Sequence, residues 1–218
     1  MSDLASDAAA VSAADLAAFL AARLCHDIIS PASAIVSGLD LLDDPSAQDM
    51  RDEAMGLIST SARKLVEMLG FIRVAYGASA AAETFEARDL ELLTRGVFKH
   101  VRPDLEWAVT TAQLNKPAAR VLLNLAMLGT GALPAGGLAR LGAQMIAGQI
   151  VLSLEAIGPK VRMRPEVLSG LRGEPKGQAL GGHWVQAYYL QAVLRDAGGQ
   201  LELSLGEDRI AVVARLAA

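Results

Sequence analysis

The sequence has little of what disulfide-bonded, metal-binding or nucleic-acid-binding proteins need. Its single cysteine, Cys25, excludes an internal disulfide and suits a reducing compartment. The three histidines are scattered without the spacing of metal ligands, so we expect no metal site. The 24 acidic and 20 basic residues give a net charge of -4, with no basic block to follow a phosphate backbone. These features argue against nucleic acid as a partner.

Targeting and membrane signals are also missing. The first 15 residues carry three aspartates and no basic residue, so they lack the positive and apolar regions of a secretory signal. We interpret residues 1–14 as a flexible arm. The longest uncharged stretch, residues 121–139, is interrupted by an asparagine, a proline and several glycines, which spanning helices rarely combine. We therefore expect a cytoplasmic protein with no membrane-crossing segment.

What the sequence does contain is apolar residues, 52% of 218, which is enough to bury a real core. Between Asp15 and Leu42 these residues recur every three or four positions, which predicts one helix with an apolar stripe. The stripe consists of Leu20, Leu24, Ile28, Pro31, Ile35, Leu39 and Leu42. The segment DDPSAQD, residues 43–49, ends this helix and begins the next, and its Ser46 and Asp49 resemble a capping box.

A second helical stripe runs from Ala54 to Tyr76, and the short connection makes the two helices antiparallel neighbours. Two helices alone make a poor core, so the simplest way to bury both stripes is against a second copy of the chain. We therefore predict that residues 15–77 form a helical hairpin that pairs into a dimeric four-helix bundle. Residues 78–84 are mostly small and uncharged, and we expect a linker there.

Beyond the linker, helical and strand-like patterns alternate. The expected helices cover residues 87–101, a run from Lys116 onward and residues 183–197, and the expected strands cover residues 105–109, 138–146 and 149–157. The chain ends in a predicted β-hairpin over residues 198–216, with its turn at residues 206–208. Residues 85–218 are thus expected to form an α/β sandwich with a mixed sheet.

One histidine stands out in the first helix, within the segment HDIISP at residues 26–31. His26 lies two positions from both Leu24 and Ile28 of the stripe, so it faces away from the core. Its own face carries small side chains, which are Ala22, Ser30, Ser33 and Ser37. An exposed imidazole is largely neutral near neutral pH, and its free lone pair can attack phosphorus. Pro31 removes a backbone donor from the helix, which predicts a bend that presents the histidine.

Two interpretations of this face remain open on the residues alone. His26 is either a nucleophile or a solvated surface histidine, and the small residues form either a docking lane or a face where helices pack closely. Asp27 is not expected beside His26, because adjacent residues on a helix point in different directions. For the same reason we assign Cys25 to packing and not to catalysis.

The segment HDIISP resembles the phosphoacceptor box of bacterial histidine kinases, which also lies on the first helix of a hairpin. Later segments resemble the nucleotide-binding boxes of the same kinases. These segments are RVLLNLAML at residues 120–128, EAIGPK at residues 155–160 and GQALGGHWV at residues 177–185. The resemblance implies that the second half of the chain has the fold of a kinase ATPase domain.

These boxes depart from the kinase pattern where a nucleotide would bind. Asn124 matches the second asparagine of the first box, but Arg120 replaces the other. Ala156 replaces the aspartate whose carboxylate would accept a hydrogen bond from adenine. Lys160 and Ala179 stand where glycines would let the backbone approach the nucleotide. The resemblance therefore implies a degenerate ATPase domain that does not bind ATP.

Four segments are similar to the ChpT-type histidine phosphotransferases: LCHDIISPASAIVSGLDLL, LPAGG, RPEVLSGLRGEP and LGGHWVQA. This resemblance implies a homodimeric phosphotransferase of a bacterial cell-cycle phosphorelay. It would take a phosphoryl group from the receiver domain of a CckA-like hybrid kinase onto His26. It would then pass the group to CtrA-like and CpdR-like response regulators. Receivers hold their own Mg²⁺, so we expect no cofactor on this chain.

The residues expected to bind these partners surround His26. Arg23 and Asp27 are candidates for polar docking contacts, with simple solvation as the alternative. The small lane would receive the first helix of the receiver. The full set of expected partner-binding residues is Phe19, Ala22, Arg23, Asp27, Ser30, Ser33, Val36 and Ser37. His100 and His183 are interpreted as structural.

Two other functions remain as alternatives. A working sensor kinase core would bind nucleotide, against which the missing aspartate at position 156 argues. A non-catalytic adaptor would use the bundle only to hold partners, and it would keep signalling when His26 is replaced by alanine.

Overall fold

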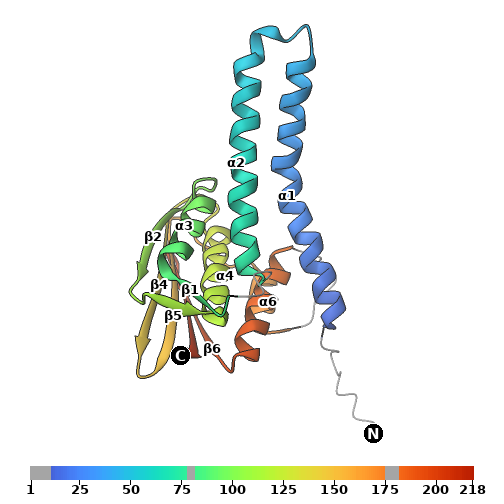
Figure 1. The fold of residues 1–218 in the computed structure, drawn as a ribbon. Helices are drawn as coiled ribbons and strands as arrows, with labels where there is room; N and C mark the ends of the chain where they lie inside the picture. The colour runs from blue at the N-terminus through green and yellow to red at the C-terminus, as the bar shows by residue number, and fades with distance from the viewer. Residues whose placement is uncertain (1–10, 78–81, 175–181) are drawn as a thin grey trace.

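The computed structural model describes residues 11–77, 82–174 and 182–218. It begins with two long antiparallel helices, α1 (Ala13–Asp43) and α2 (Arg51–Ala75), which project beyond the rest of the molecule (Figure 1). A short 3-10 helix, η1 (Gln48–Met50), leads into α2. The predicted hairpin is present. Its first helix begins before Asp15, because the Ser12 side chain accepts a hydrogen bond from the Asp15 backbone N–H at 3.1 Å.

The two helices approach closely at Gly38. A Cβ atom there would lie 2.6 Å from Ile58 Cγ1 and 3.1 Å from the Ala54 carbonyl oxygen, so only glycine allows this crossing. Pro31 is buried on the same side of α1. Figure 1 shows that the N-terminal part of α1 leans away from the line of its C-terminal part, which is the bend expected of an internal proline.

The connection between the helices differs from the expected capping box. Ser46 donates from its backbone N–H and its hydroxyl to Asp44 Oδ1, at 2.8 and 2.7 Å. It therefore stabilises the turn after α1, and α2 begins without a side-chain cap. The prediction was wrong because Pro45 and Ser46 form a turn, which places Ser46 too early in the chain to cap α2.

The second part of the chain contains a five-stranded sheet in the order β2-β4-β5-β7-β6. Its strands are β2 (Asp104–Val109), β4 (Leu138–Ile146), β5 (Gln149–Ile157), β6 (Gln200–Leu205) and β7 (Arg209–Ala217). β2 runs parallel to β4, and the other neighbours pair antiparallel. The mixed sheet predicted from the sequence is confirmed, and β4 and β5 have the predicted bounds.

Helices cover one face of this sheet. They are α3 (Ala87–Phe98), α4 (Lys116–Ala132), α5 (Pro165–Leu171) and α6 (Gly182–Asp196). α4 contacts β4, β5 and β7 on one side and α2 and α6 on others, so it is buried almost all round. Figure 1 shows α4 and α6 between the sheet and the hairpin. The main core therefore continues from the sheet into the base of α2, where Phe71 and Val74 belong to it.

Three short elements were not expected. β1 (Thr84–Glu86) pairs antiparallel with β3 (Gln113–Asn115), and α5 lies between the expected strand at residues 149–157 and the expected helix at residues 183–197. Because β1 begins at Thr84, the end of the predicted linker belongs to the α/β domain. Residues 78–81 of that linker and residues 1–10 of the predicted arm lie outside the described residues.

One described helix, α1, is long and apolar enough by length and composition to cross a membrane, with a mean hydropathy of 1.3. Helices of soluble bundles pass the same test. α1 contacts α2 and α6 and carries an ion pair between Arg23 and Asp27 in its first half. We interpret it as a bundle helix.

Candidate functional site

His26 lies on the open side of α1, with 83% of its side-chain surface exposed. The residues of the predicted lane on the same face, Ala22, Ser30, Ser33 and Ser37, are all exposed as well. Val36, beside the lane, is 56% exposed. An approaching segment therefore finds small side chains, Ala22 and Ser30, four residues before and after His26.

Asp27 lies beside His26, contrary to the sequence-based expectation. Asp27 Oδ1 is 3.2 Å from His26 Nδ1. The expectation was wrong because Nδ1 is the ring nitrogen closest to the backbone, and a short carboxylate on the next residue reaches it along the helix surface. A carboxylate only accepts, so this contact favours the neutral tautomer with the hydrogen on Nδ1 and the lone pair on Nε2. This tautomer directs the free nitrogen away from the carboxylate.

Arg23 holds the other oxygen of the same carboxylate. Its Nε donates to Asp27 Oδ2 at 2.7 Å, across one turn of α1. Only 18% of the Arg23 side chain and 20% of the Asp27 side chain are exposed. The pair therefore lies at the shielded edge of the lane, and its predicted docking contacts stay a prediction. The spacing of four residues was the sequence signal for this ion pair.

The first turns of α6 pack against α1 next to this pair. Phe19 meets Trp184 edge to face with ring centroids 6.1 Å apart, and Trp184 stacks on Tyr188. Gly182 lies against Arg23, because a Cβ at position 182 would be 2.8 Å from Arg23 Cδ. Phe19 thus contacts its own chain, and its predicted contact with a partner stays a prediction. Gly182 and Trp184 were not identified from the sequence.

The residues of the first nucleotide box join α4 to the end of α2. Asn124 is fully buried, and its side-chain amide donates to the carbonyls of Ala75 at 3.0 Å and Arg120 at 2.9 Å. The Arg120 guanidinium covers Gly77, where any Cβ would overlap it. Asn124 and Arg120 therefore fasten the hairpin to the α/β domain.

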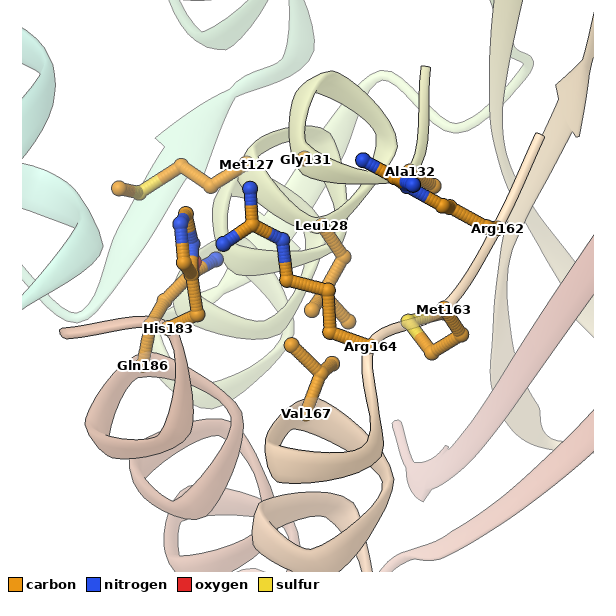
Figure 2. Close-up of a pocket in the computed structure, with 10 residues that line it drawn as sticks. All are labelled: Met127, Leu128, Gly131, Ala132, Arg162, Met163, Arg164, Val167, His183 and Gln186. Carbon is orange, nitrogen blue, oxygen red and sulfur yellow. The ribbon is translucent and has the colours of Figure 1, made fainter. Parts of the chain in front are cut away.

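A small hollow lies between α4, α5 and α6 (Figure 2). Arg164, just before α5, and His183, at the start of α6, both point into it. It leaves about 10 Å³ for the centre of a water molecule, which is room for about one water. Burial lowers the pKa of His183, and the charges of Arg23 and Arg164 lower it further.

Two other positions differ from the nucleotide-binding boxes of the kinases, Ala156 and Ala179. Ala156 is fully buried in β5, in place of the expected carboxylate. Ala179 lies outside the described residues. Within the described ranges, no three His, Cys, Asp or Glu side chains gather where they could hold a metal ion.

Known proteins are similar to this chain in both sequence and fold. A family model described as the histidine phosphotransferase C-terminal domain matches residues 87–209. The chain is 33% identical over 196 residues to the protein phosphotransferase ChpT of Brucella abortus (strain 2308), covering 88% of this chain and 91% of that protein. A solved structure of a bacterial phosphotransferase matches with a TM-score of 0.84 and 30% identity over 95% of this chain and 98% of its own. The chain, with its helical hairpin and its α/β domain, therefore belongs to the histidine phosphotransferase family.

Proposed function

We propose that His26 is the residue on which this phosphotransferase carries the phosphoryl group. The carrying observation is the geometry of the ring: it is 83% exposed, and its Nδ1 lies 3.2 Å from Asp27 Oδ1, which leaves Nε2 as the nitrogen that this carboxylate does not contact. A neutral imidazole with a free Nε2 is a competent nucleophile toward the phosphorus of an aspartyl phosphate. The small lane lets the pocket of a receiver come within reach of that nitrogen.

The transfer step balances without a group from elsewhere in this chain. A bond forms between His26 Nε2 and phosphorus, and the bond between phosphorus and the receiver's aspartate oxygen breaks, which leaves a carboxylate. The ring becomes positively charged, and Asp27 stabilises it through Nδ1–H. The reverse step passes the group to the next receiver. Mg²⁺ belongs to the receiver, so this chain supplies the nucleophile and its alignment.

The partners that fit this role are receiver domains. The resemblance to ChpT-type proteins supports a CckA-like hybrid kinase as the donor and CtrA-like and CpdR-like response regulators as acceptors. The name of the Brucella abortus relative, a protein phosphotransferase, agrees with protein partners. The lane of Ala22, Ser30, Ser33 and Ser37, with Val36 beside it, is our proposed surface for the receiver. The relay would operate in the cytoplasm, where such receivers are found.

ATP is not part of the proposed activity. Asn124 is engaged with Ala75 and Arg120 in the interior, and buried Ala156 offers no carboxylate to adenine. The hollow between α4, α5 and α6 has room for about one water molecule, whereas a nucleotide needs a pocket of about 300 Å³ or more. These features support a phosphotransferase without autokinase activity.

The exposed apolar side chains of the hairpin would be buried if two copies of the chain formed a homodimer. Large apolar side chains on both helices, apart from Val36 of the proposed receiver surface, are exposed in the single chain: Ile29, Leu39, Met55, Leu57, Val66 and Leu69. So many exposed apolar side chains on one helical pair mark an interaction surface. A second copy would bury them in a four-helix bundle.

The test is to mix the purified protein with a phosphorylated receiver domain and Mg²⁺ and to follow acid-labile phosphate on each chain. We expect label on the wild type and none on His26→Ala, and we expect no label from ATP alone. Label on His26→Ala would place the acceptor elsewhere. Label from ATP would reveal a kinase, and no transfer from any of a panel of receivers would favour the adaptor.

A further inference from the structure

We propose that helix α6 controls how His26 is oriented, through a contact chain that runs from Gly182 to Arg23, then to Asp27 and His26. In this contact chain Arg23 is a positioning residue for the transfer reaction. Gly182 has no side chain and so leaves the space in which Arg23 lies. The proposal rests on the proposed function of His26 as phosphoacceptor. It adds a role for the α/β domain in the chemistry, although that domain contributes no group to the reacting atoms.

The first step of the contact chain is a carboxylate held at both ends. Asp27 Oδ2 accepts from Arg23 Nε at 2.7 Å, and Oδ1 lies 3.2 Å from His26 Nδ1. Oδ1 can stay in line with the ring only while Oδ2 is fixed, because both oxygens turn together about one bond. Charge-assisted hydrogen bonds of this kind set geometry strongly when they are shielded from water, as the low exposure of Arg23 and Asp27 indicates.

The second step is the close approach of Gly182 on α6 to the Arg23 side chain. A Cβ at position 182 would lie 2.8 Å from Arg23 Cδ, 3.0 Å from Nη1 and 3.6 Å from Nε. The last of these atoms is the one that binds Asp27. An alanine at position 182 therefore collides with the arm of Arg23 that sets the hydrogen bond. Gly182 has no left-handed backbone conformation, so alanine fits the backbone itself.

This collision should change the stability of the fold little, but it should displace Arg23 from Asp27. The atoms in the way belong to the far end of a flexible side chain, which can swing aside without moving a helix. α6 also has other anchors on α1, since Trp184 packs on Phe19 and belongs to a cluster with Leu16 and Leu20. Helix docking does not depend on Arg23, so a change at position 182 isolates the positioning effect.

The closing experiment compares Gly182→Ala with Gly56→Ala. Gly56 lies in α2 with nothing within 4 Å of its added Cβ, which makes it a matched control for a glycine change in a helix. Two readouts are used for each protein. One is the single-turnover rate of transfer from a phosphorylated receiver, measured over a range of receiver concentrations. The other is the ¹⁵N NMR signature of the His26 ring, which reports which nitrogen carries the hydrogen.

We expect Gly182→Ala to lower the maximal transfer rate by about tenfold, the low end of the effects known for groups that orient a metal-bound histidine. The receiver concentration at half-maximal rate should change less than the maximal rate, because Ala22, Ser30, Ser33 and Ser37 of the proposed receiver surface are not altered. The NMR spectrum should show a smaller share of the tautomer with hydrogen on Nδ1. Gly56→Ala should match the wild type in both readouts, and neither variant should unfold at a lower denaturant midpoint than the wild type, because alanine favours a helix more than glycine does.

Arg23 variants and a double substitution test the order of the contacts. Arg23→Gln should reproduce the Gly182→Ala defect, and Arg23→Lys should restore part of the rate, since lysine keeps the charge but not the guanidinium geometry. In an Asp27→Asn background, Gly182→Ala should have little further effect, because both act through the same carboxylate. Additive losses would contradict the contact chain.

Failure of the proposal is distinguishable from failure of the proposed function. If the wild type transfers normally and Gly182→Ala matches it in rate and ring tautomer, the contact chain is wrong. If the wild type accepts no phosphoryl group on His26, the proposed function is wrong. The NMR comparison then decides the contact chain by itself, because an unchanged tautomer population in Gly182→Ala overturns it.

Discussion

At the scale of single residues, His26 and the two charged groups beside it differ in their exposure to solvent. The imidazole is open to solvent, whereas the guanidinium and carboxylate that orient it lie mostly covered at the junction with α6. A hydrogen bond shielded from water is stronger and better aligned than one at the surface. The ring is therefore free to meet a partner while its support stays in place.

A pH effect belongs to this scale. The pKa of His183 is lowered from its usual 6.5, first by burial and then by Arg23 and Arg164, against the opposing charges of Glu166 and Asp27. The unfolded chain therefore binds a proton at this residue more readily than the folded chain does. The stability that His183 contributes is present above pH 6.5 and is lost as the pH falls below it.

We expect His183→Gln to make the protein less sensitive to acid. Urea unfolding at pH 7.5 and at pH 5.5 measures this directly. The loss of unfolding free energy between the two pH values should be smaller in the variant than in the wild type. An equal loss in both proteins would mean that His183 takes up its proton in the folded state as easily as in the unfolded chain.

The sequence predicted which residues share the exposed face of α1, while their roles stay predictions. His26 and its lane follow from the period of one helix, and the structure places all of them on the exposed face. The contact between Asp27 and His26 was missed because it depends on side-chain torsions, which residue spacing does not define. The close approach of Gly182 to Arg23 could not be predicted, since it joins two helices that are far apart in the chain.

At the scale of elements, the junction between α2 and α4 links the two parts of the molecule. The amide of Asn124 bonds the last turn of α2, the guanidinium of Arg120 covers Gly77, and the rings of Tyr76 and Tyr189 lie 5.1 Å apart. Burial raises the pKa of the Tyr76 hydroxyl well above its usual value, so the ring stays uncharged in this contact. The end of α2 is thereby built into the α/β domain.

Replacing Asn124 tests this junction. Asn124→Ala removes the donor to the buried carbonyl of Ala75 and should lower the free energy of unfolding by about 1–3 kcal/mol. Urea unfolding measures the loss. Hydrogen exchange should rise first in the last turns of α2, while the amides of β5 and β7 stay protected. An unchanged unfolding midpoint would show that the hydrogen bond is dispensable.

Long elements were predicted well and short ones were not. The stripes of the hairpin and the alternation in β4 and β5 continue over many residues, so the pattern defines them. β1 and β3 have three residues each and exist because they pair with one another. Such strands depend on a tertiary contact, and a three-residue window carries no period to detect.

At the scale of the whole molecule, the exposed apolar side chains of the hairpin are the basis of the proposed dimer. Val66 on α2 is 70% exposed, and Leu92 on α3 of the α/β domain is 61% exposed. The two are similar in character, but only Val66 lies on the proposed bundle face. They form a matched pair for testing where the dimer contact lies.

We expect Val66→Glu to weaken the dimer and Leu92→Glu to leave it intact. An unpaired carboxylate in the bundle core would cost roughly 3 kcal/mol, which is about a hundredfold in Kd. Sedimentation velocity over a range of protein concentrations measures the shift. Dissociation by Leu92→Glu instead would move the interface to the α/β domain, and a monomeric wild type would remove it altogether.

The open position of His26 also has a consequence for timing. Under the proposed function, a phosphoryl group on this exposed ring would lie in solvent, where the next receiver could reach it directly. Protein pairs associate at about 10⁵–10⁷ M⁻¹ s⁻¹, which gives about 0.1–10 productive encounters per second at a receiver concentration of about 1 μM. The waiting time on the carrier then follows receiver abundance. Competing receivers would then share the phosphoryl groups in proportion to their concentrations and association rates.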